Sequence, residues 1–165
     1  MPWTSTGLQH GYGITSRQRG FCWTHSIATH RPDAWRCTAG NDIYDPCFVR
    51  PEHGDQVACA QTPFSRSLVF MRTSKPLGTE RSAMVRWLQH KGEPWAVRLE
   101  NGDKCALITG ATEIVEGKRL HYVCVRSGWI AGFPDRSAGT VWTVQVLPDP
   151  AEKRLDTLRV TTAVF

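Results

Sequence analysis

Six cysteines are the residues whose type and spacing say most about the chemistry of this chain. They stand at Cys22, Cys37, Cys47, Cys59, Cys105 and Cys124. None belongs to a C-x-x-C pair, and the gaps are too wide and irregular for a zinc ribbon or a thioredoxin-like redox site. Structural disulfides are the better interpretation, and they predict folding in an oxidising compartment. Pairing neighbours along the chain needs no long detour, but the sequence leaves the connectivity open.

Serine, histidine and carboxylate side chains give weaker signals of catalysis. No G-x-S-x-G or S-x-x-K motif occurs, and Ser26 directly follows His25, so the two face apart on an extended chain. His25 and His30 lack metal-ligand spacing and are expected at the surface, and no metal or cofactor is predicted. Asp45 and Asp135 remain the candidate catalytic acids, although each stands in a turn-forming context where Asp most often caps a turn.

Aromatic side chains are the more suggestive set, because the chain has seven tryptophans. Flat rings stack on the apolar faces of sugars or on proline, while neighbouring Arg and Asp side chains fix the orientation of the ligand. Trp95 and Trp142 stand in strand-like patterns and are expected in the core. Other rings stand in loop-like segments and are candidates for exposure. The predicted ligand-binding residues are Trp35, Arg36, Tyr44, Asp45 and Trp129.

The charge balance is basic but diffuse. The chain has 165 residues, with 20 Lys and Arg against 15 Asp and Glu, a net charge of +5. No run of five basic residues occurs, so the charge favours a solvated face or weak attraction to anionic envelope polymers, and specific nucleic-acid recognition is not expected. No transmembrane segment is predicted. The first residues carry no export signal, so we expect that the sequence begins inside a longer secreted or anchored protein.

The elements that must position these residues are mostly strands. Runs rich in β-branched and aromatic residues cover 21–28, 68–73, 94–100, 104–109, 119–125, 140–147 and 158–164. Asn101-Gly102 predicts a hairpin between two of them. The segment Asp33–Phe48 resembles a short loop pinned by cysteines, and Thr79–Lys91 has helical spacing. The sequence therefore predicts an all-β sandwich or small barrel with one short helix, stapled by disulfides. Residues 1–20 are expected to be a flexible arm or linker end, and 21–165 a single domain.

Several longer strings carry a resemblance to a known family. They are CWTHSIATHRPDAWRCTAGNDIYDPCF from Cys22, PWAVRLENGDKCALITGATEIVEGKRLHYVC from Pro94, PDRSAGTVWTV from Pro134 and the closing TTAVF. With these strings the chain resembles a family of uncharacterised actinobacterial extracellular Cys-rich domains. Such domains occur alone as exported proteins or lipoproteins, or after a membrane-anchored serine/threonine kinase region. The resemblance implies a disulfide-bonded module facing the cell envelope, and it implies no activity. His25 and His30 depart from the family pattern.

The function that follows is a non-catalytic extracellular module for binding or sensing. Its ligand would be a cell-envelope component: a glycan, a peptidoglycan fragment or a partner protein. One alternative is a small secreted hydrolase or a β-barrel pocket enzyme such as a cyclase, and another is a structural domain of a larger envelope protein. A deep cavity lined by Asp45 or Asp135 would favour an enzyme, whereas a flat aromatic surface would favour binding. The oligomeric state is left open.

Overall fold

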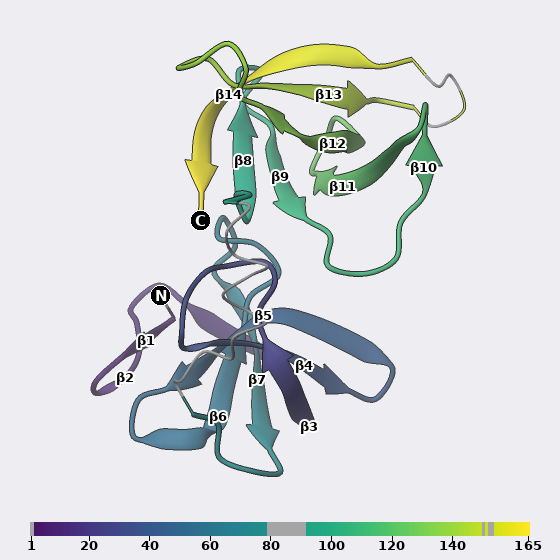
Figure 1. Ribbon diagram of the computed structural model, residues 1–165. Coiled ribbons are helices and arrows are strands. Elements are labelled where there is room, and N and C mark those ends of the chain that lie inside the picture. The colour runs from purple at the N-terminus through teal and green to yellow at the C-terminus, as the bar shows by residue number, and fades with distance from the viewer. Residues whose placement is uncertain (1, 79–91, 150, 152–153) are drawn as a thin grey trace. The chain divides into compact units, whose positions relative to one another are not determined.

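The computed structural model describes residues 2–78, 92–149, 151 and 154–165 (Figure 1). Within these residues the regular secondary structure is β-strand throughout, so the all-β prediction is confirmed. The helix expected over Thr79–Lys91 lies outside the described residues. The chain divides into two compact units, Met1–Lys91 and Gly92–Phe165, rather than the single domain expected over 21–165. Each unit has its own hydrophobic core, which the pattern of strands along the sequence did not reveal.

The first unit is built around a small closed barrel. Its strands are β1 (Trp3–Thr4), β2 (Gly7–Leu8), β3 (Gly13–His25), β4 (Ala34–Ala39), β5 (Asp42–Arg50), β6 (His53–Cys59) and β7 (Ser67–Thr73). Strands β3 to β7 close the barrel, and β1 and β2 form a separate hairpin. The contact between β3 and β7 is parallel, whereas the other barrel contacts are antiparallel.

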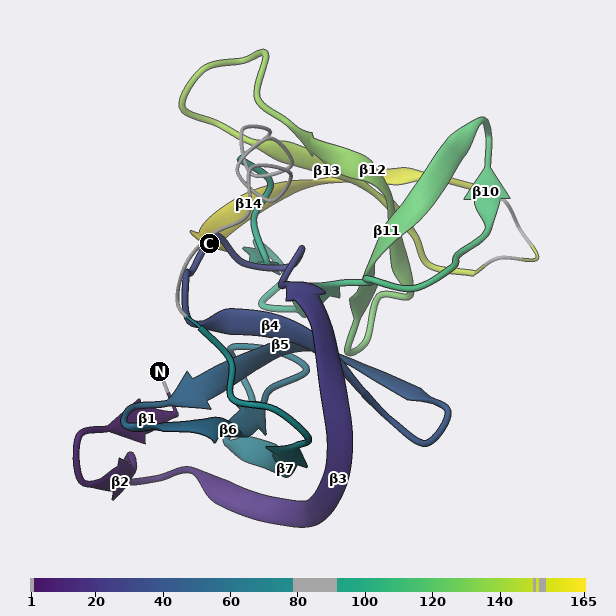
Figure 2. The ribbon, with the colours of Figure 1, turned by 60° about the horizontal axis from the view of Figure 1, so that its bottom comes forward.

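The long strand β3 closes this barrel by changing partner at Gly20. Its first part pairs with β7 and its last part, from Phe21, pairs with β4. A Cβ atom on Gly20 would collide with the carbonyl oxygen of Thr38 and would lie 2.7 Å from the sulfur of Met71. Only glycine fits at this close approach. Figure 2 shows the result as one long strand that bends as it passes along the barrel.

Two disulfides staple the first unit across neighbouring strands. Cys22–Cys37 joins β3 to β4 and Cys47–Cys59 joins β5 to β6, and in each bridge the two residues are direct partners in the strand register. Cys37, Cys47 and Cys59 belong to a core cluster that also includes Val57 and Met71, and Cys22 packs against this cluster. Neighbouring cysteines along the chain are therefore paired. Each bridge contributes about 2–4 kcal/mol, largely by restricting the unfolded chain.

The expectation of a flexible arm over residues 1–20 is wrong. Trp3 is only 7% exposed, and its indole N–H donates a hydrogen bond of 2.9 Å to the carbonyl oxygen of Phe48. The Trp3 ring also packs edge-on against Phe70, with 6.5 Å between ring centroids. Strand β3 then begins at Gly13. A single buried tryptophan anchors the segment, and its Gly- and Ser-rich composition hid the alternation that makes β3 a strand.

The predicted loop Asp33–Phe48 is also a hairpin. Strands β4 and β5 pair across a turn at Gly40, which has a φ of 59°. The register shifts between Trp35 and Cys37, so the two strands do not alternate regularly across this point. Asp45-Pro46, which predicts a turn, lies inside β5 near that irregularity. Proline is tolerated in strands at such places, because a ladder hydrogen bond is already missing there.

The second unit is an antiparallel ring of strands. Its strands are β8 (Ala96–Leu99), β9 (Lys104–Leu107), β10 (Ile114–Val115), β11 (Lys118–Cys124), β12 (Trp129–Asp135), β13 (Thr143–Leu147) and β14 (Asp156–Val164). The pairing of β11 with β9 closes the ring, and β10 adds to β11. The hairpin predicted at Asn101-Gly102 joins β8 to β9, and Cys105–Cys124 bridges β9 and β11. Five of the predicted strand runs are found here in the expected order.

Candidate ligand-binding face

The outward side of β3 carries the residues best suited to hold a ligand. Side chains alternate along a strand, and from Gly13 to Trp23 the exposed and less exposed residues of β3 alternate without a break. Gln18 and Cys22 face the barrel interior, where Gln18 donates a hydrogen bond of 2.9 Å to the hydroxyl of Tyr44. Four residues that alternate with these inward positions face outward. They are Arg17, Arg19, Phe21 and Trp23.

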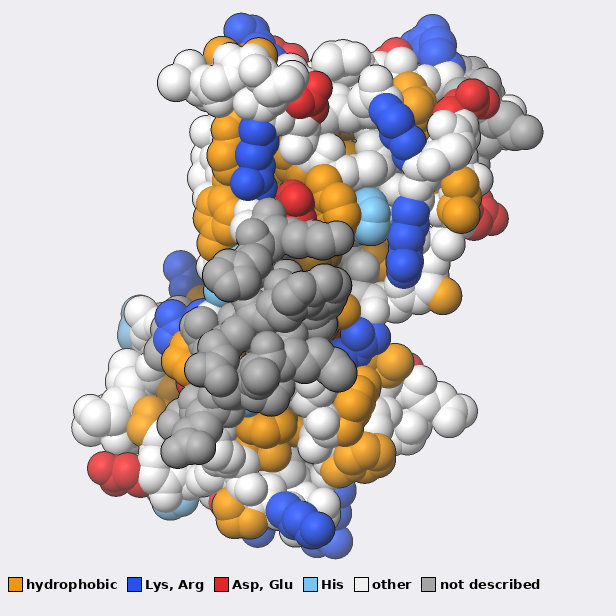
Figure 3. Space-filling view, in the orientation of Figure 1, with side chains coloured by type: hydrophobic (Ala, Val, Ile, Leu, Met, Phe, Trp, Pro, Cys, Tyr) orange, Lys and Arg blue, Asp and Glu red, His pale blue; other side chains and the backbone are white. Residues whose placement is uncertain are grey.

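Two of these outward residues form an exposed aromatic surface. Phe21 is 53% exposed and Trp23 is 46% exposed, and their ring centroids are 6.1 Å apart at an interplanar angle of 58°. The guanidinium of Arg36, on β4, lies 5.6 Å from the centre of the Trp23 ring. Ile43, on β5, is 52% exposed. It lies in register with Phe21, because both residues are strand partners of Thr38 on β4. We call these four residues the aromatic face. Figure 3 shows hydrophobic side chains gathered over β3 and β4 on this unit.

Asp45 is a half-buried carboxylate that organises the chain after β3. Its Oδ1 accepts a hydrogen bond of 2.5 Å from the hydroxyl of Ser26, and its Oδ2 accepts one of 3.2 Å from the N–H of Ile27. Burial raises the pKa of Asp45 to about 6, against the opposing effects of these hydrogen bonds and the charge of Arg36. The carboxylate therefore holds the turn next to the aromatic face and is electrostatically coupled to Arg36.

Two of the aromatic residues predicted to bind ligand are packed inside the protein. Tyr44 is only 9% exposed and belongs to the core of the first unit. Trp35 is half-buried, stacks on His25 with 4.2 Å between ring centroids and donates its indole N–H to the carbonyl oxygen of Gly78 at 3.1 Å. His25, expected at the surface, is 3% exposed because Trp35 covers it. Neither predicted ring offers an open face, whereas Arg36 is part of the aromatic face and Asp45 interacts electrostatically with Arg36.

Trp129 and Asp135 lie on β12, in the other unit. Trp129 is half-buried and lines an open, mainly apolar hollow of ≈ 500 Å³ together with Ile108 and Leu120. Asp135 is exposed, and its Oδ1 accepts a hydrogen bond of 2.8 Å from the N–H of Ser137, which lowers the pKa of Asp135. A lowered pKa is opposite to what a general acid needs. Asp135 therefore caps a turn, as the alternative interpretation of this residue expected.

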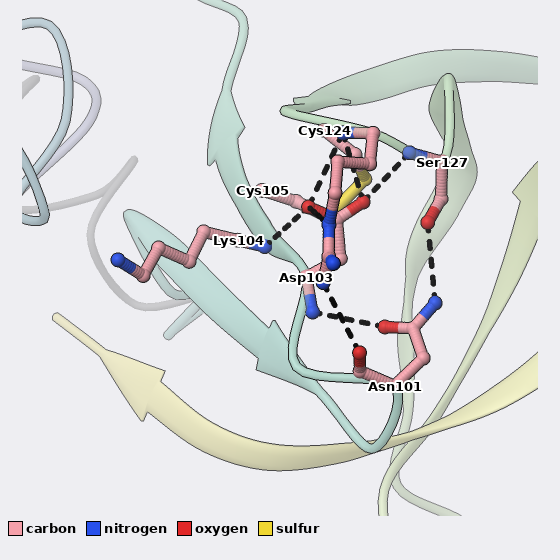
Figure 4. Close-up of a disulfide and its surroundings, with 7 residues drawn as sticks. Asn101, Asp103, Lys104, Cys105, Cys124 and Ser127 are labelled. Atoms are coloured by element: carbon pink, nitrogen blue, oxygen red, sulfur yellow. Dashed lines mark hydrogen bonds and ion pairs between the residues drawn. A yellow bond between two sulfur atoms is a disulfide. The ribbon is translucent and has the colours of Figure 1, made fainter.

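The most buried carboxylate of the second unit is Asp103, and its role is structural. It is 1% exposed and accepts hydrogen bonds from the backbone N–H groups of Lys104, Arg126 and Ser127. Burial acts to raise the pKa of Asp103, but these hydrogen bonds outweigh burial and hold the pKa below its ordinary value. Figure 4 shows this carboxylate beside the Cys105–Cys124 bridge. These bonds hold the start of β9 against the segment that follows β11, so the carboxylate serves the fold.

Neither metal nor thiol chemistry is indicated. Residues 2–78, 92–149, 151 and 154–165 contain no group of three His, Cys, Asp or Glu side chains placed to hold a metal ion. All six cysteines are bridged, so no thiol is free. The same described ranges contain no helix capable of crossing a lipid bilayer.

Comparison with known proteins adds no relative. No protein-family model, curated protein or solved structure matches this chain. The resemblance to actinobacterial extracellular domains therefore stays a prediction.

The aromatic face was missed in the sequence, although a signal for it was present. Phe21 and Trp23 flank Cys22, and a cysteine in a structural disulfide turns inward. On a strand the residues on both sides of an inward side chain turn outward. The tripeptide Phe-Cys-Trp therefore predicts two exposed rings. The loop-like context of Trp35 and Tyr44 instead favoured rings that the structure shows to be half-buried and buried.

Proposed function

We propose that this chain is a non-catalytic extracellular binding module that holds a cell-envelope glycan on the aromatic face of its first unit. The observation that carries the proposal is the exposure of Phe21 and Trp23 side by side, with the Arg36 guanidinium over the Trp23 ring. Burying such a ring is worth roughly 1.5–3 kcal/mol, so leaving two exposed together marks an interaction surface.

The chemistry of the face fits a glycan better than an apolar partner. Sugars present apolar C–H faces that stack on flat rings, and they present hydroxyl groups that need donors and acceptors nearby. The Arg36 guanidinium adds a positive charge 5.6 Å from the centre of the Trp23 ring, and Asp45, whose oxygens accept hydrogen bonds from Ser26 and Ile27, interacts electrostatically with Arg36. The three disulfides support an oxidising, extracellular location for this binding.

The enzyme alternative has less support from the geometry. The two hollows that we describe, one lined by Trp129 and one lined by Arg17 and Arg72, include neither Asp45 nor Asp135 in their walls. Asp45 also spends its carboxylate oxygens on Ser26 and Ile27. A general acid must instead reach the atom that it protonates. We therefore place Asp45 as a positioning residue of the binding face.

The proposal is tested by measuring the affinity of soluble glycans for a variant of the aromatic face and for a matched control variant. The probes are chitohexaose, a neutral amino-sugar glycan, and glycan strands released from peptidoglycan. Trp23→Ala is expected to weaken binding about tenfold, because one stacked ring contributes roughly 1 kcal/mol or more. Ile114→Ala is the matched control, since Ile114 is a 71% exposed hydrophobic residue of the second unit.

The melting temperature separates a binding role from a structural one. Trp23→Ala removes an exposed ring, so the melting temperature should stay within about 2 °C of the parent protein. Equal glycan affinity in Trp23→Ala, Ile114→Ala and the parent protein would contradict the proposal and would favour a structural domain. A large loss of stability would show that Trp23 supports the barrel instead.

A further inference from the structure

We propose that the glycan is anionic, and that its acidic groups bind three arginines that lie next to the aromatic face along β3 and β7. These arginines are Arg17, Arg19 and Arg72, and we call them the arginine groove. The inference deepens the proposed function and rests on it, because it places one linear ligand along the whole outward side of β3.

The arginine groove is an open surface hollow that includes one aromatic ring in its lining. It has a volume of ≈ 470 Å³ and is lined by the three arginines together with Gln18 and Phe70. In the parallel pairing of β3 with β7, Arg17 is the partner of Phe70, and Arg19 is the partner of Arg72. The guanidinium of Arg17 lies 4.9 Å from the centre of the Phe70 ring. The protein therefore places three guanidinium groups around one cavity.

The positive charge of the groove is only partly balanced by the protein. Arg72 forms an ion pair of 3.2 Å with Asp55. No carboxylate in the described part of the chain forms an ion pair with Arg17 or Arg19. Arg19 and Arg72 are strand partners, and neighbouring like charges repel each other. A bound oxyanion would relieve this repulsion.

Carboxylate and phosphate groups are the anions that suit these side chains. The planar guanidinium offers two parallel N–H donors that match the two oxygens of a carboxylate or phosphate. Arg17 and Arg19 are two residues apart on one strand, a separation of roughly 6.5 Å. Two acidic groups carried by successive parts of one polymer could therefore be held together.

The arginine groove continues directly into the aromatic face. Arg17, Arg19, Phe21 and Trp23 all lie on the outward side of β3, and the alternation of exposure is unbroken through the change of partner at Gly20. From Arg17 to Trp23 the strand extends about 20 Å, the length of several sugar rings. Charged groups of a linear glycan would lie on the arginines while its rings stack on Phe21 and Trp23.

An anionic polysaccharide fits better than a nucleic acid, the other linear polymer with these features. Three disulfides indicate a protein that works outside the reducing cytosol. Preferential binding of a nucleic acid would therefore contradict the proposal.

The test compares three polymers by isothermal titration calorimetry over a series of salt concentrations. The probes are oligogalacturonate, which carries a carboxylate on each sugar, neutral chitohexaose, and single-stranded poly-dT. We expect the parent protein to bind oligogalacturonate more tightly than chitohexaose at low salt. Arg17→Gln/Arg19→Gln should lose about tenfold or more in affinity for oligogalacturonate and make its salt dependence shallower, with no change for chitohexaose.

Matched variants keep the result interpretable. Lys118→Gln/Arg154→Gln removes the same charge from the second unit and should bind like the parent protein. Arg17→Lys/Arg19→Lys keeps the charge but removes the bidentate donors, so its affinity should fall between those of the parent and the glutamine variant. Because Arg17 and Arg19 are exposed, both variants should fold as the parent does by circular dichroism.

Each contrary outcome has a distinct meaning. The groove variant is Arg17→Gln/Arg19→Gln. If it binds oligogalacturonate as tightly as the Lys118→Gln/Arg154→Gln control does, or if the parent protein does not bind that probe, the proposed role of the arginine groove is overturned. Tighter binding of poly-dT than of oligogalacturonate, lost in the groove variant, overturns the glycan in favour of a nucleic acid. If Phe21→Ala/Trp23→Ala keeps full affinity for oligogalacturonate while the groove variant loses it, the anion site stands and the proposed aromatic site fails.

Discussion

The two units use their charged side chains in different ways. In the second unit, arginines pair with carboxylates: Arg159 with Glu100 at 2.7 Å, Arg136 with Glu93 at 3.3 Å and Arg126 with the buried Asp103 at 3.8 Å. In the first unit, Arg31 and Arg72 also form ion pairs with carboxylates. Arg17 and several other arginines of this unit lie over aromatic rings, as Arg136 of the second unit does over Trp142. A guanidinium over a ring keeps N–H donors available at its edge. Among the described residues, arginine–carboxylate pairs therefore predominate in the second unit and arginine–ring contacts in the first. This difference in degree is consistent with the ligand-binding role that we propose for the first unit.

The largest expected effect comes from the disulfides, which are unequally divided between the units. The first unit has two bridges and the second has one. Each closes a short loop and contributes about 2–4 kcal/mol, so reduction should destabilise the first unit about twice as much as the second. Hydrogen exchange followed by mass spectrometry, with and without reductant, measures the two units separately. The double substitutions Cys47→Ala/Cys59→Ala and Cys105→Ala/Cys124→Ala are the matched pair. Equal loss of protection in both units under reductant would contradict the expectation that the first unit depends more on its disulfides.

The next largest effect is expected from Asp103, which belongs to the second unit alone. Asp103→Ala leaves three backbone N–H groups without their acceptor and should cost about 2–3 kcal/mol of unfolding free energy. Because the folded-state pKa lies below the ordinary 3.8, this stabilisation is present above that pH and is lost as the pH falls through the folded pKa. Asp149→Ala is the control, since Asp149 caps an exposed turn. Denaturant melts at neutral and acidic pH measure the unfolding free energy of each protein. An Asp103→Ala protein as stable as the Asp149→Ala control would contradict the expected loss.

A smaller effect of opposite sign is expected from Asp45 in the first unit. Its pKa is raised from 3.8 to about 6, so the folded state holds the proton more tightly than the unfolded state. The stability that this gives is fully present below about pH 4 and is lost as the pH rises through about 6, a change on the order of 2 kcal/mol. Asp45→Asn should remove this dependence. The unfolding free energies of the parent protein and of Asp45→Asn would be measured between about pH 4 and pH 6. The same slope against pH in both proteins would contradict the expected role of Asp45.

Regular alternation is the part of this fold that could be predicted from sequence. Strand β13 and the Asn101-Gly102 hairpin follow directly from local pattern and turn chemistry, and β7 was expected within one residue of its observed bounds. The parallel contact of β3 with β7 could not be predicted, because it joins residues about fifty positions apart. It also depends on the close approach of Gly20 to Thr38, where a side chain would collide. Long-range closure of this kind leaves no local signal.

The candidate site was only partly predictable for a related reason. Arg36 and Asp45 were identified because charged residues near aromatics are suggestive, and both lie by the aromatic face. Tyr44 and Trp35 were assigned to a loop, because a proline inside β5 looks like a turn when its neighbours are unknown. Exposure of a ring depends on which face of the strand is inward, and that is set by the disulfide partner of Cys22.

Chemical-shift mapping by NMR would show directly whether glycans bind along the outward side of β3. Oligogalacturonate and chitohexaose would be titrated into isotope-labelled protein, and the backbone amides and tryptophan indole N–H groups would be followed. The account predicts that both glycans shift the Trp23 indole and the amides of Phe21 and Arg36, and that only the anionic glycan also shifts the signals of Arg17 and Arg19. Shifts confined to the second unit around Trp129, or no shift at Trp23 with either glycan, would contradict it.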